Sequence, residues 1–204
     1  RSGHLTLVNQ DAELPGDFVP YNLVRLSLRS VSGPHELRKE AALALEALFE
    51  QAQSEGYELY VKSSYRSYQT QSTKYYNRLE KYGKDDGVVA KPGTSDHQTG
   101  LGVDVLNREW ANREGMTPAF GETAEAKWLE ANCARFGFII RYLPDKQEIT
   151  KIIYEPGICA MWGRRLPPIS WRIVCAWKNL RYRPVRQLRR MKLPAVISRR
   201  WYAP

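Results

Sequence analysis

The segment of residues 93–105, GTSDHQTGLGVDV, constrains the fold of this chain more than any other. From Leu101 onward, apolar residues alternate with Gly102 and Asp104, which is the two-residue period of a strand. The glycines allow tight turns and a close approach of the backbone, so we expect His97 on a loop just before that strand. His97 and Asp104 can then point into one cleft, and both residue types are good zinc ligands. The same spacing also suits a turn histidine and a strand-end aspartate that make ordinary hydrogen bonds.

Helices and short strands are predicted on both sides of this segment, and 204 residues suffice for one domain with a sizeable core. Ser67 and Thr123 are favourable N-caps, and Gly83 is a natural helix stop. Pro34 suits the start of a helix and Gly56 its end. The periodicity predicts helices at 34–55, 67–81 and 124–135, and strands at 57–63, 101–105, 138–142 and 151–154. Helices packed on a small, mostly antiparallel sheet form an α+β domain.

Three motifs carry a resemblance to a known family. They are SSYRSYQTQ at 63–71, KPGTSDHQTGLGVDV at 91–105 and FGFIIRYLPDKQEITKIIYEP at 136–156. Together they resemble the VanY-like D-alanyl-D-alanine carboxypeptidases, which are zinc peptidases that trim bacterial cell-wall peptides. The resemblance covers about residues 5–156 and implies that His97 and Asp104 are zinc ligands. In such peptidases the zinc lowers the pKa of its bound water and polarises the scissile carbonyl.

The same resemblance assigns the other residues of the site. It implies that Glu155 is the catalytic base and that Arg66 binds the developing oxyanion or the carboxylate of the peptide. It implies that Gln71, Ser95 and Tyr142 bind the peptide. A guanidinium suits its role because it can bind a carboxylate with two hydrogen bonds. An exposed surface arginine and an ordinary strand tyrosine remain the alternatives for two of these positions.

The third zinc ligand of the family is missing from this chain. In the family it is the histidine of a Glu-Pro-Trp-His segment. Glu155 and Pro156 match that segment, but Gly157 and Ile158 stand where the family has Trp and His. Cys159 is the neighbouring residue that could bind zinc, since a thiolate is a good ligand, but we do not expect it to substitute. The zinc site is therefore incomplete, and we expect the chain to be inactive or nearly so.

A one-base deletion accounts for this departure. The family continues Trp-His-Leu-Arg-Tyr-Val-Gly, which can be encoded as TGG CAT CTG CGC TAT GTG GG. Removal of the first T gives GGC ATC TGC GCT ATG TGG GG, which encodes the GICAMWG found at 157–163. Composition agrees, because residues 157–204 contain ten Arg, two Lys and no acidic residue. They carry +12, whereas the whole chain carries +9, which leaves −3 for residues 1–156.

The domain organisation predicted from these observations has three parts. Residues 1–33 form an extended lead-in, 34–156 an incomplete zinc D,D-carboxypeptidase domain, and 157–204 an out-of-frame basic tail. A basic arm that binds nucleic acid or a membrane surface is the alternative for the tail, but it does not explain why the break falls inside a metal motif. The chain begins at Arg1 without a methionine or a signal peptide, which suggests either a processed end or an artificially chosen boundary.

Partners and location follow from the resemblance. The expected partner is a peptidoglycan stem peptide ending in D-Ala, bound by a monomer in the cell envelope or periplasm. No nucleic-acid partner and no membrane span are expected. An L,D-carboxypeptidase, a peptidoglycan endopeptidase and a non-catalytic wall-peptide binder are the alternative functions. His35 is expected to be a solvated first-turn residue, and Cys133 a small buried residue on a helix.

Overall fold

The computed structural model describes residues 8–161, and it has the expected α+β architecture. Its main sheet has the strand order β3-β4-β6-β5, and all neighbouring strands are antiparallel. A second small sheet pairs β1 with β2. The strands are β1 (Leu23–Arg25), β2 (Glu36–Arg38), β3 (Leu59–Ser63), β4 (Gly102–Asn107), β5 (Phe138–Tyr142) and β6 (Glu155–Met161).

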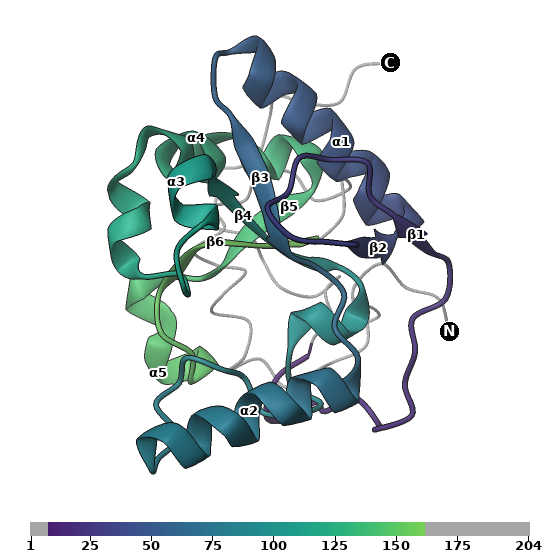
Figure 1. The fold of residues 1–204 in the computed structure, drawn as a ribbon, viewed down its shortest axis with the longest axis vertical. Helices are drawn as coiled ribbons and strands as arrows, with labels where there is room; N and C mark the ends of the chain where they lie inside the picture. Colours follow the sequence, from purple (N-terminus) through teal and green to yellow (C-terminus); the bar gives the residue numbers. More distant parts are fainter. Residues whose placement is uncertain (1–7, 162–204) are drawn as a thin grey trace, which may run out of the picture.

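Helices surround the main sheet on both sides. In Figure 1, α1 runs along one side of the sheet and α2 lies across the bottom of the molecule. The helices are α1 (Lys39–Ser54), α2 (Tyr68–Tyr82), α3 (Arg108–Ala111), α4 (Ala124–Asn132) and α5 (Gln147–Thr150). Short 3-10 turns lie at Asp96–Thr99, Pro118–Glu122, Cys133–Phe136 and Pro144–Lys146. None of the helices within residues 8–161 is long and apolar enough to cross a membrane.

Strand alternation separates a hydrophobic face of the main sheet from the face that carries polar groups. Val103 and Val105 of β4 lie in the core, together with Leu45 of α1 and Leu129 of α4. Asp104 lies between the two valines, so its side chain emerges on the opposite face. The strand predicted at 101–105 is therefore confirmed, and its pleat sets the direction of the aspartate.

Local capping signals predicted the helix ends well. Ser67 is the N-cap of α2 and accepts a hydrogen bond from the backbone N–H of Thr70 at 3.2 Å. Gly83 ends α2 in the left-handed conformation, with φ of 69°. Thr123 caps α4 in the same way, through the backbone N–H of Ala126. The caps predicted from the sequence are confirmed.

One predicted helix start and one predicted strand are wrong. The first helix begins at Lys39 rather than at 34, because residues 36–38 pair with β1 as strand β2. The strand predicted at 151–154 does not form. Instead α5 ends at Lys151 in the left-handed conformation, with φ of 59°, and β6 begins at Glu155. The backbone N–H of Ile153 donates to the carbonyl of Gly87, so this segment pairs with a distant loop.

Candidate active site

His97 and Asp104 lie close together, as the sequence predicts. His97 lies in the 3-10 turn Asp96–Thr99 and Asp104 lies in the middle of β4. The His97 Nε2 atom is 3.2 Å from Asp104 Oδ1, and the side chains are 6% and 15% exposed. His97 Nδ1 is 2.7 Å from the carbonyl oxygen of Ser64. Since a carbonyl only accepts, Nδ1 carries a proton, and Nε2 is the ring nitrogen that faces Asp104.

Asp104 has the character of an ionised acceptor. Burial works to raise the pKa of Asp104, but the neighbouring His97, Arg66 and Lys74 side chains outweigh burial and lower that pKa below its usual value. Within residues 8–161, its buried Oδ1 accepts no hydrogen bond. Nε2 of His97 and Oδ1 of Asp104, two atoms of types that bind metals, thus face each other in a buried place, which is an arrangement that a metal cation satisfies.

Arg66 lies at the corner between β3 and α2, and its neighbours hold it in place. One terminal nitrogen donates to Gln71 Oε1 at 2.7 Å and the other to Ser63 Oγ at 2.9 Å. Gln71 Nε2 in turn donates to the carbonyl of Ala90 at 2.6 Å, and Gln71 is 1% exposed. Burial lowers the pKa of Arg66, while the charges of Asp104 and other nearby groups raise it. Both polar ends of Gln71 are therefore used to orient the arginine.

Glu155 and Tyr142 lie side by side on adjacent strands. They are direct register partners between β5 and β6, and both are buried, with 9% and 6% of their surface exposed. Burial, reinforced by the negative charge of Asp104, raises the pKa of Glu155 well above its ordinary value, against the opposing effect of Arg66. A carboxyl group with a raised pKa suits proton transfer near neutral pH. Ser95 is buried directly before the turn that carries the histidine.

Ile158 lies where the third metal ligand is expected. It is the register partner of Asp104 between β4 and β6, so the two side chains emerge on the same face. It packs in a buried apolar cluster with Tyr142 and Ile152. Cys159 pairs with Val103 and points into the core on the opposite face, where burial raises its thiol pKa well above the usual value. Cys159 therefore points away from Asp104 and cannot join it in binding a metal.

Within residues 8–161, the expected zinc site has two of its donors in place. His97 and Asp104 supply two oriented donors, whereas a catalytic zinc takes three protein ligands and a water. Among residues 8–161, no group of three or more His, Cys, Asp or Glu side chains could hold a metal ion. The hydrocarbon side chain of Ile158 offers no donor, so the fit to zinc fails at that position.

Several residues of the site were not recognised from the sequence. Ser64 orients His97 through its backbone carbonyl, which no side-chain pattern can signal. Asp96 and Arg141 form a buried ion pair at 2.8 Å, although only the position of Asp96 beside His97 could have drawn attention to it. The expectation of a solvated His35 is wrong. It is partly buried, with Nδ1 3.2 Å from Ser64 Oγ, because Glu36 at the start of β2 is hydrogen-bonded to Ser64 and Tyr65, the residues that follow β3.

An α+β domain that gathers a histidine–aspartate pair, an arginine and a buried glutamate on one face of its sheet has the layout of a zinc peptidase. The comparisons with known proteins agree with that class. The chain belongs to the VanY D-alanyl-D-alanine carboxypeptidase family, whose model matches residues 34–159. The family recognised from the three motifs is therefore confirmed.

Individual relatives support the same assignment. The chain is 43% identical over 167 residues to the YodJ protein of Bacillus subtilis, a match that covers 79% of this chain and 60% of that protein. It is 32% identical over 163 residues to a D-alanyl-D-alanine carboxypeptidase of Enterococcus faecalis, covering 74% of this chain and 56% of the relative. The chain thus spans less than two thirds of the length of these relatives.

Solved structures share the fold over most of the chain. The LD-carboxypeptidase LdcB has a TM-score of 0.74 and 37% identity, covering 86% of this chain and 82% of LdcB. A vancomycin-resistance D,D-pentapeptidase VanY, solved as a mutant in complex with Zn(II), has a TM-score of 0.60 and 29% identity, covering 78% of this chain and 88% of that one. The α+β fold predicted from the sequence is confirmed.

Proposed function

We propose that the cleft of this chain is that of a zinc-dependent D-alanyl-D-alanine carboxypeptidase acting on peptidoglycan stem peptides, and that the chain as written is inactive or nearly so. The observation that carries both parts is the pairing of Ile158 with Asp104. A metal ligand at that position would complete a triad with Asp104 and His97. With isoleucine there, two donors remain.

The residues that remain are suited to peptide binding. Arg66 is a fixed cation beside Asp104 and Glu155, so it can bind the carboxylate of a peptide that ends in D-Ala. Gln71 supports this role by holding Arg66, while Ser95 and Tyr142 line the peptide site. Glu155 holds or releases a proton at the same place. These roles require no metal, which makes a non-catalytic binder of wall peptides the second candidate function.

One binding experiment tests both the proposed inactivity and the assignment of the peptide site. A stem peptide ending in D-Ala-D-Ala is titrated into the protein by calorimetry, with and without a chelator, and hydrolysis is followed by release of D-alanine. Binding that survives the chelator, without hydrolysis, is the expected result. Hydrolysis that the chelator abolishes would contradict the proposed inactivity. Absence of binding and of hydrolysis would contradict the assignment of the cleft.

The bond that an intact cleft would cleave has two further candidates. Similarity to LdcB, an LD-carboxypeptidase, favours an L,D bond as the first alternative. A peptidoglycan endopeptidase of the same family is the other. A panel of stem peptides with D,D, L,D and cross-linked ends distinguishes the three by which of them bind. The expected setting is extracytoplasmic, with the chain acting as a monomer.

A shift of the reading frame after Pro156 is a separate proposal. Support comes from the codon arithmetic, from the charge imbalance and from the end of the family match at residue 159. Residues 157–161 are part of β6, and 162–204 lie outside the described residues. The nucleotide sequence of the gene decides the matter. A verified reading frame, with no neighbouring frame encoding Trp-His, would refute the frameshift.

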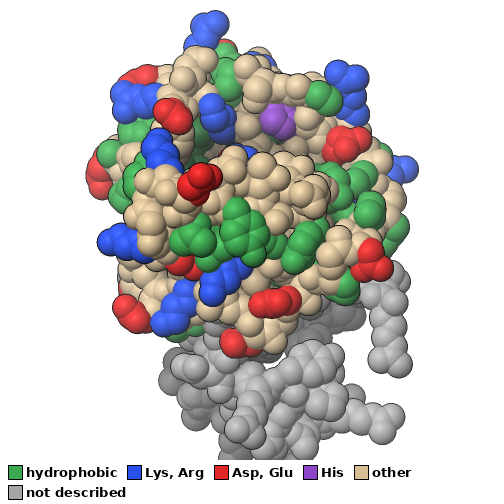
Figure 2. All heavy atoms as spheres, turned by 60° about the horizontal axis from the view of Figure 1, so that its bottom comes forward, with side chains coloured by type: hydrophobic (Ala, Val, Ile, Leu, Met, Phe, Trp, Pro, Cys, Tyr) green, Lys and Arg blue, Asp and Glu red, His purple; other side chains and the backbone are tan. Residues whose placement is uncertain are grey.

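The rival function of a basic arm is tested by truncation. The cut belongs after Met161, because β6 runs to that residue and is buried along its whole length. On the face shown in Figure 2, acidic and basic side chains are interspersed, so that face has no extended basic surface. Salt-sensitive binding of nucleic acid or anionic vesicles that disappears on truncation would favour the arm over the peptide cleft.

A further inference from the structure

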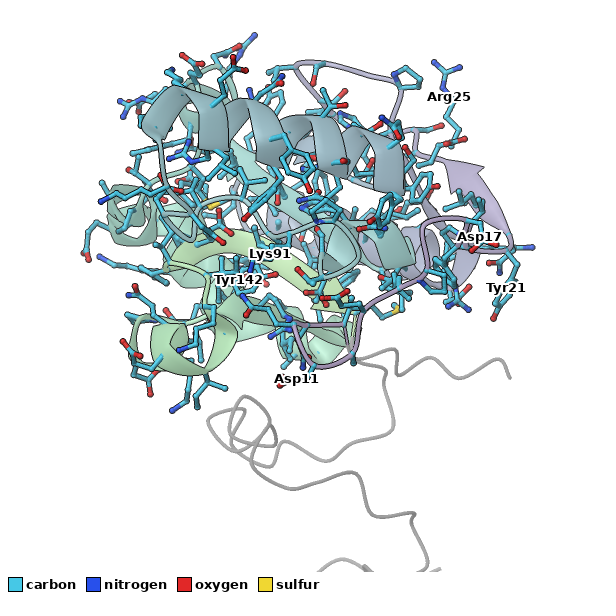
Figure 3. The ribbon with its side chains drawn as sticks, turned by 90° about the horizontal axis from the view of Figure 1, so that it is seen from below. Asp11, Asp17, Tyr21, Arg25, Lys91 and Tyr142 are labelled. Atoms are coloured by element: carbon cyan, nitrogen blue, oxygen red, sulfur yellow. The ribbon has the colours of Figure 1, made fainter. Side chains whose placement is uncertain are left out.

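A buried network joins Tyr142 to the turn that carries His97. The Tyr142 hydroxyl donates to Asp96 Oδ2 at 3.2 Å, and Arg141 Nε donates to the same oxygen at 2.8 Å. A terminal nitrogen of Arg141 donates to the carbonyl of Val8 at 3.2 Å. Seen from below, Tyr142 lies in the interior of the domain, whereas Asp17 and Tyr21 lie at its edge (Figure 3).

The chemistry of these groups fixes the direction of each hydrogen bond. An arginine only donates, and a carboxylate that is paired with an arginine only accepts. The proton between Tyr142 and Asp96 must therefore come from the phenol. Burial raises the pKa of Tyr142 well above its usual value, and the charge of Asp96 adds to the effect, so the phenol keeps that proton.

The backbone around Asp96 is built to hold this geometry. A Cβ atom at Gly102 would lie 2.8 Å from the carbonyl carbon of Asp96, so the turn can approach β4 only because Gly102 has no side chain. Thr99 Oγ1 donates to the Asp96 carbonyl at 2.6 Å. The carboxylate is 10% exposed, as is Arg141. The acceptor for the tyrosine is thus fixed in place by its own backbone and by the arginine.

We propose that Asp96 is a positioning residue: it accepts the hydrogen bond of the Tyr142 hydroxyl, so that this proton is not available to a bound peptide. The Tyr142 oxygen can then only accept a hydrogen bond from the peptide, and it binds one of the peptide's N–H donors. The group recognised at this point is therefore an amide N–H or an ammonium, and not a carboxylate. This leaves Arg66 as the group that binds the peptide's carboxylate. The proposal rests on the peptide-binding role proposed above.

The test removes one hydrogen-bond donor of the peptide at a time. The probe is an N-acetylated tripeptide ending in D-Ala-D-Ala, with analogues in which a single backbone N–H is replaced by an ester oxygen. Calorimetry with chelator present gives each affinity for the wild-type chain and for Tyr142→Phe. In the wild type, one ester analogue is expected to bind about 10-fold more weakly than the parent peptide, the factor given by one net hydrogen bond. Tyr142→Phe is expected to bind the parent about 10-fold more weakly, with no further loss for that analogue.

A double variant tests the role of Asp96 separately from that of the tyrosine. Asp96→Ala with Arg141→Met removes the acceptor without leaving an unpaired buried charge. The freed hydroxyl can then donate to the ester oxygen, so the preference for the N–H peptide is expected to disappear. The matched control is Asp86→Ala with Arg78→Met, which removes another Asp–Arg pair, on and after α2, and should keep the full preference. A wild type that binds all analogues alike, or a Tyr142→Phe variant that still discriminates, overturns the proposal.

A direct measurement decides the case in which no peptide binds, or in which the double variant does not fold. Nuclear magnetic resonance of the wild-type chain should show a slowly exchanging hydroxyl proton that Tyr142→Phe removes. Failure of peptide binding with that resonance present would refute the proposed function alone, while Asp96 would still hold the hydroxyl. Absence of the resonance from the folded wild type would overturn the positioning role whatever the binding result.

Discussion

Replacing Ile158 with histidine is expected to supply the missing metal ligand. Ile158 and Asp104 are register partners on neighbouring antiparallel strands, so their Cβ atoms are about 4.5–5.5 Å apart. The two existing donors, His97 Nε2 and Asp104 Oδ1, are already 3.2 Å apart. An imidazole at position 158 emerges on the same face and can act as the third metal ligand beside His97 and Asp104. The hydrophobic core on the other face of the sheet is unchanged.

The expected gain follows from the strength of zinc sites. Four-ligand sites bind zinc with about 10–16 kcal/mol, which corresponds to roughly 3 kcal/mol for each ligand. Some of this is lost by placing an imidazole in the apolar cluster of Tyr142 and Ile152. A gain of about 100-fold in zinc affinity is therefore expected for Ile158→His. Equilibrium competition with a chromophoric chelator measures this affinity directly.

The matched control is Ile158→Phe, which introduces a flat ring without a nitrogen donor. It should bind zinc no more tightly than the wild type. Adding His97→Ala to Ile158→His should abolish the gain. If Ile158→His and Ile158→Phe bind zinc equally, then position 158 does not face the metal pair and the reasoning from strand register is refuted.

Restoring the tryptophan as well requires more than one substitution. A Cβ atom at Gly157 would lie 2.6 Å from the carbonyl oxygen of Val105 and 2.8 Å from Met116 Cε. Gly157→Trp in this chain would therefore force the strand or its neighbours to move. Activity is expected to return only when Trp-His is restored together with the in-frame sequence that follows it.

Three further predictions concern stability and its dependence on pH. Ser67→Ala removes the N-cap of α2 and should lower the free energy of unfolding by about 1 kcal/mol in urea melts, whereas an unchanged value would contradict the capping role. Gly102→Ala places a methyl group 2.8 Å from the carbonyl carbon of Asp96, and should lower the free energy of unfolding by about 1–3 kcal/mol in the same assay. An unchanged free energy of unfolding would show that the turn at Asp96 can shift away from β4 without cost. Glu155→Gln should become more stable than the wild type as pH rises above about 4.5. The raised pKa of Glu155 means that its stabilising contribution is present below its unfolded value of 4.5 and is lost as pH rises through the folded value. Melts at pH 4 and pH 7 that show the same difference would contradict this.

Short-range signals made the secondary structure predictable wherever one chemical group decides the outcome. Ser67 is an N-cap because its own oxygen reaches a backbone N–H three residues away. The alternation around Asp104 predicted both a strand and the face on which the carboxylate emerges. The predicted start of the first helix is wrong because a long-range contact decides it. Residues 36–38 pair with β1, and no local signal in the sequence reveals that pairing.

The candidate site was likewise predictable where its residues lie close together in the sequence. His97 and Asp104 are brought together by one turn and one strand, so a short motif contains the information. The partners that orient them are distant or are backbone atoms. The hydrogen bond between Arg141 and Asp96 joins residues 45 positions apart. The acceptor for His97 Nδ1 is a carbonyl of Ser64, which any residue type would offer.

Zinc analysis of the unaltered chain tests the central claim most directly. The protein is saturated with zinc, dialysed extensively against metal-free buffer and analysed for metal content per chain. A site with His97, Asp104 and an isoleucine at its third corner should retain far less than one zinc per chain. A full equivalent of zinc retained after dialysis, and lost in His97→Ala, would show that the cleft holds the metal without a ligand at position 158.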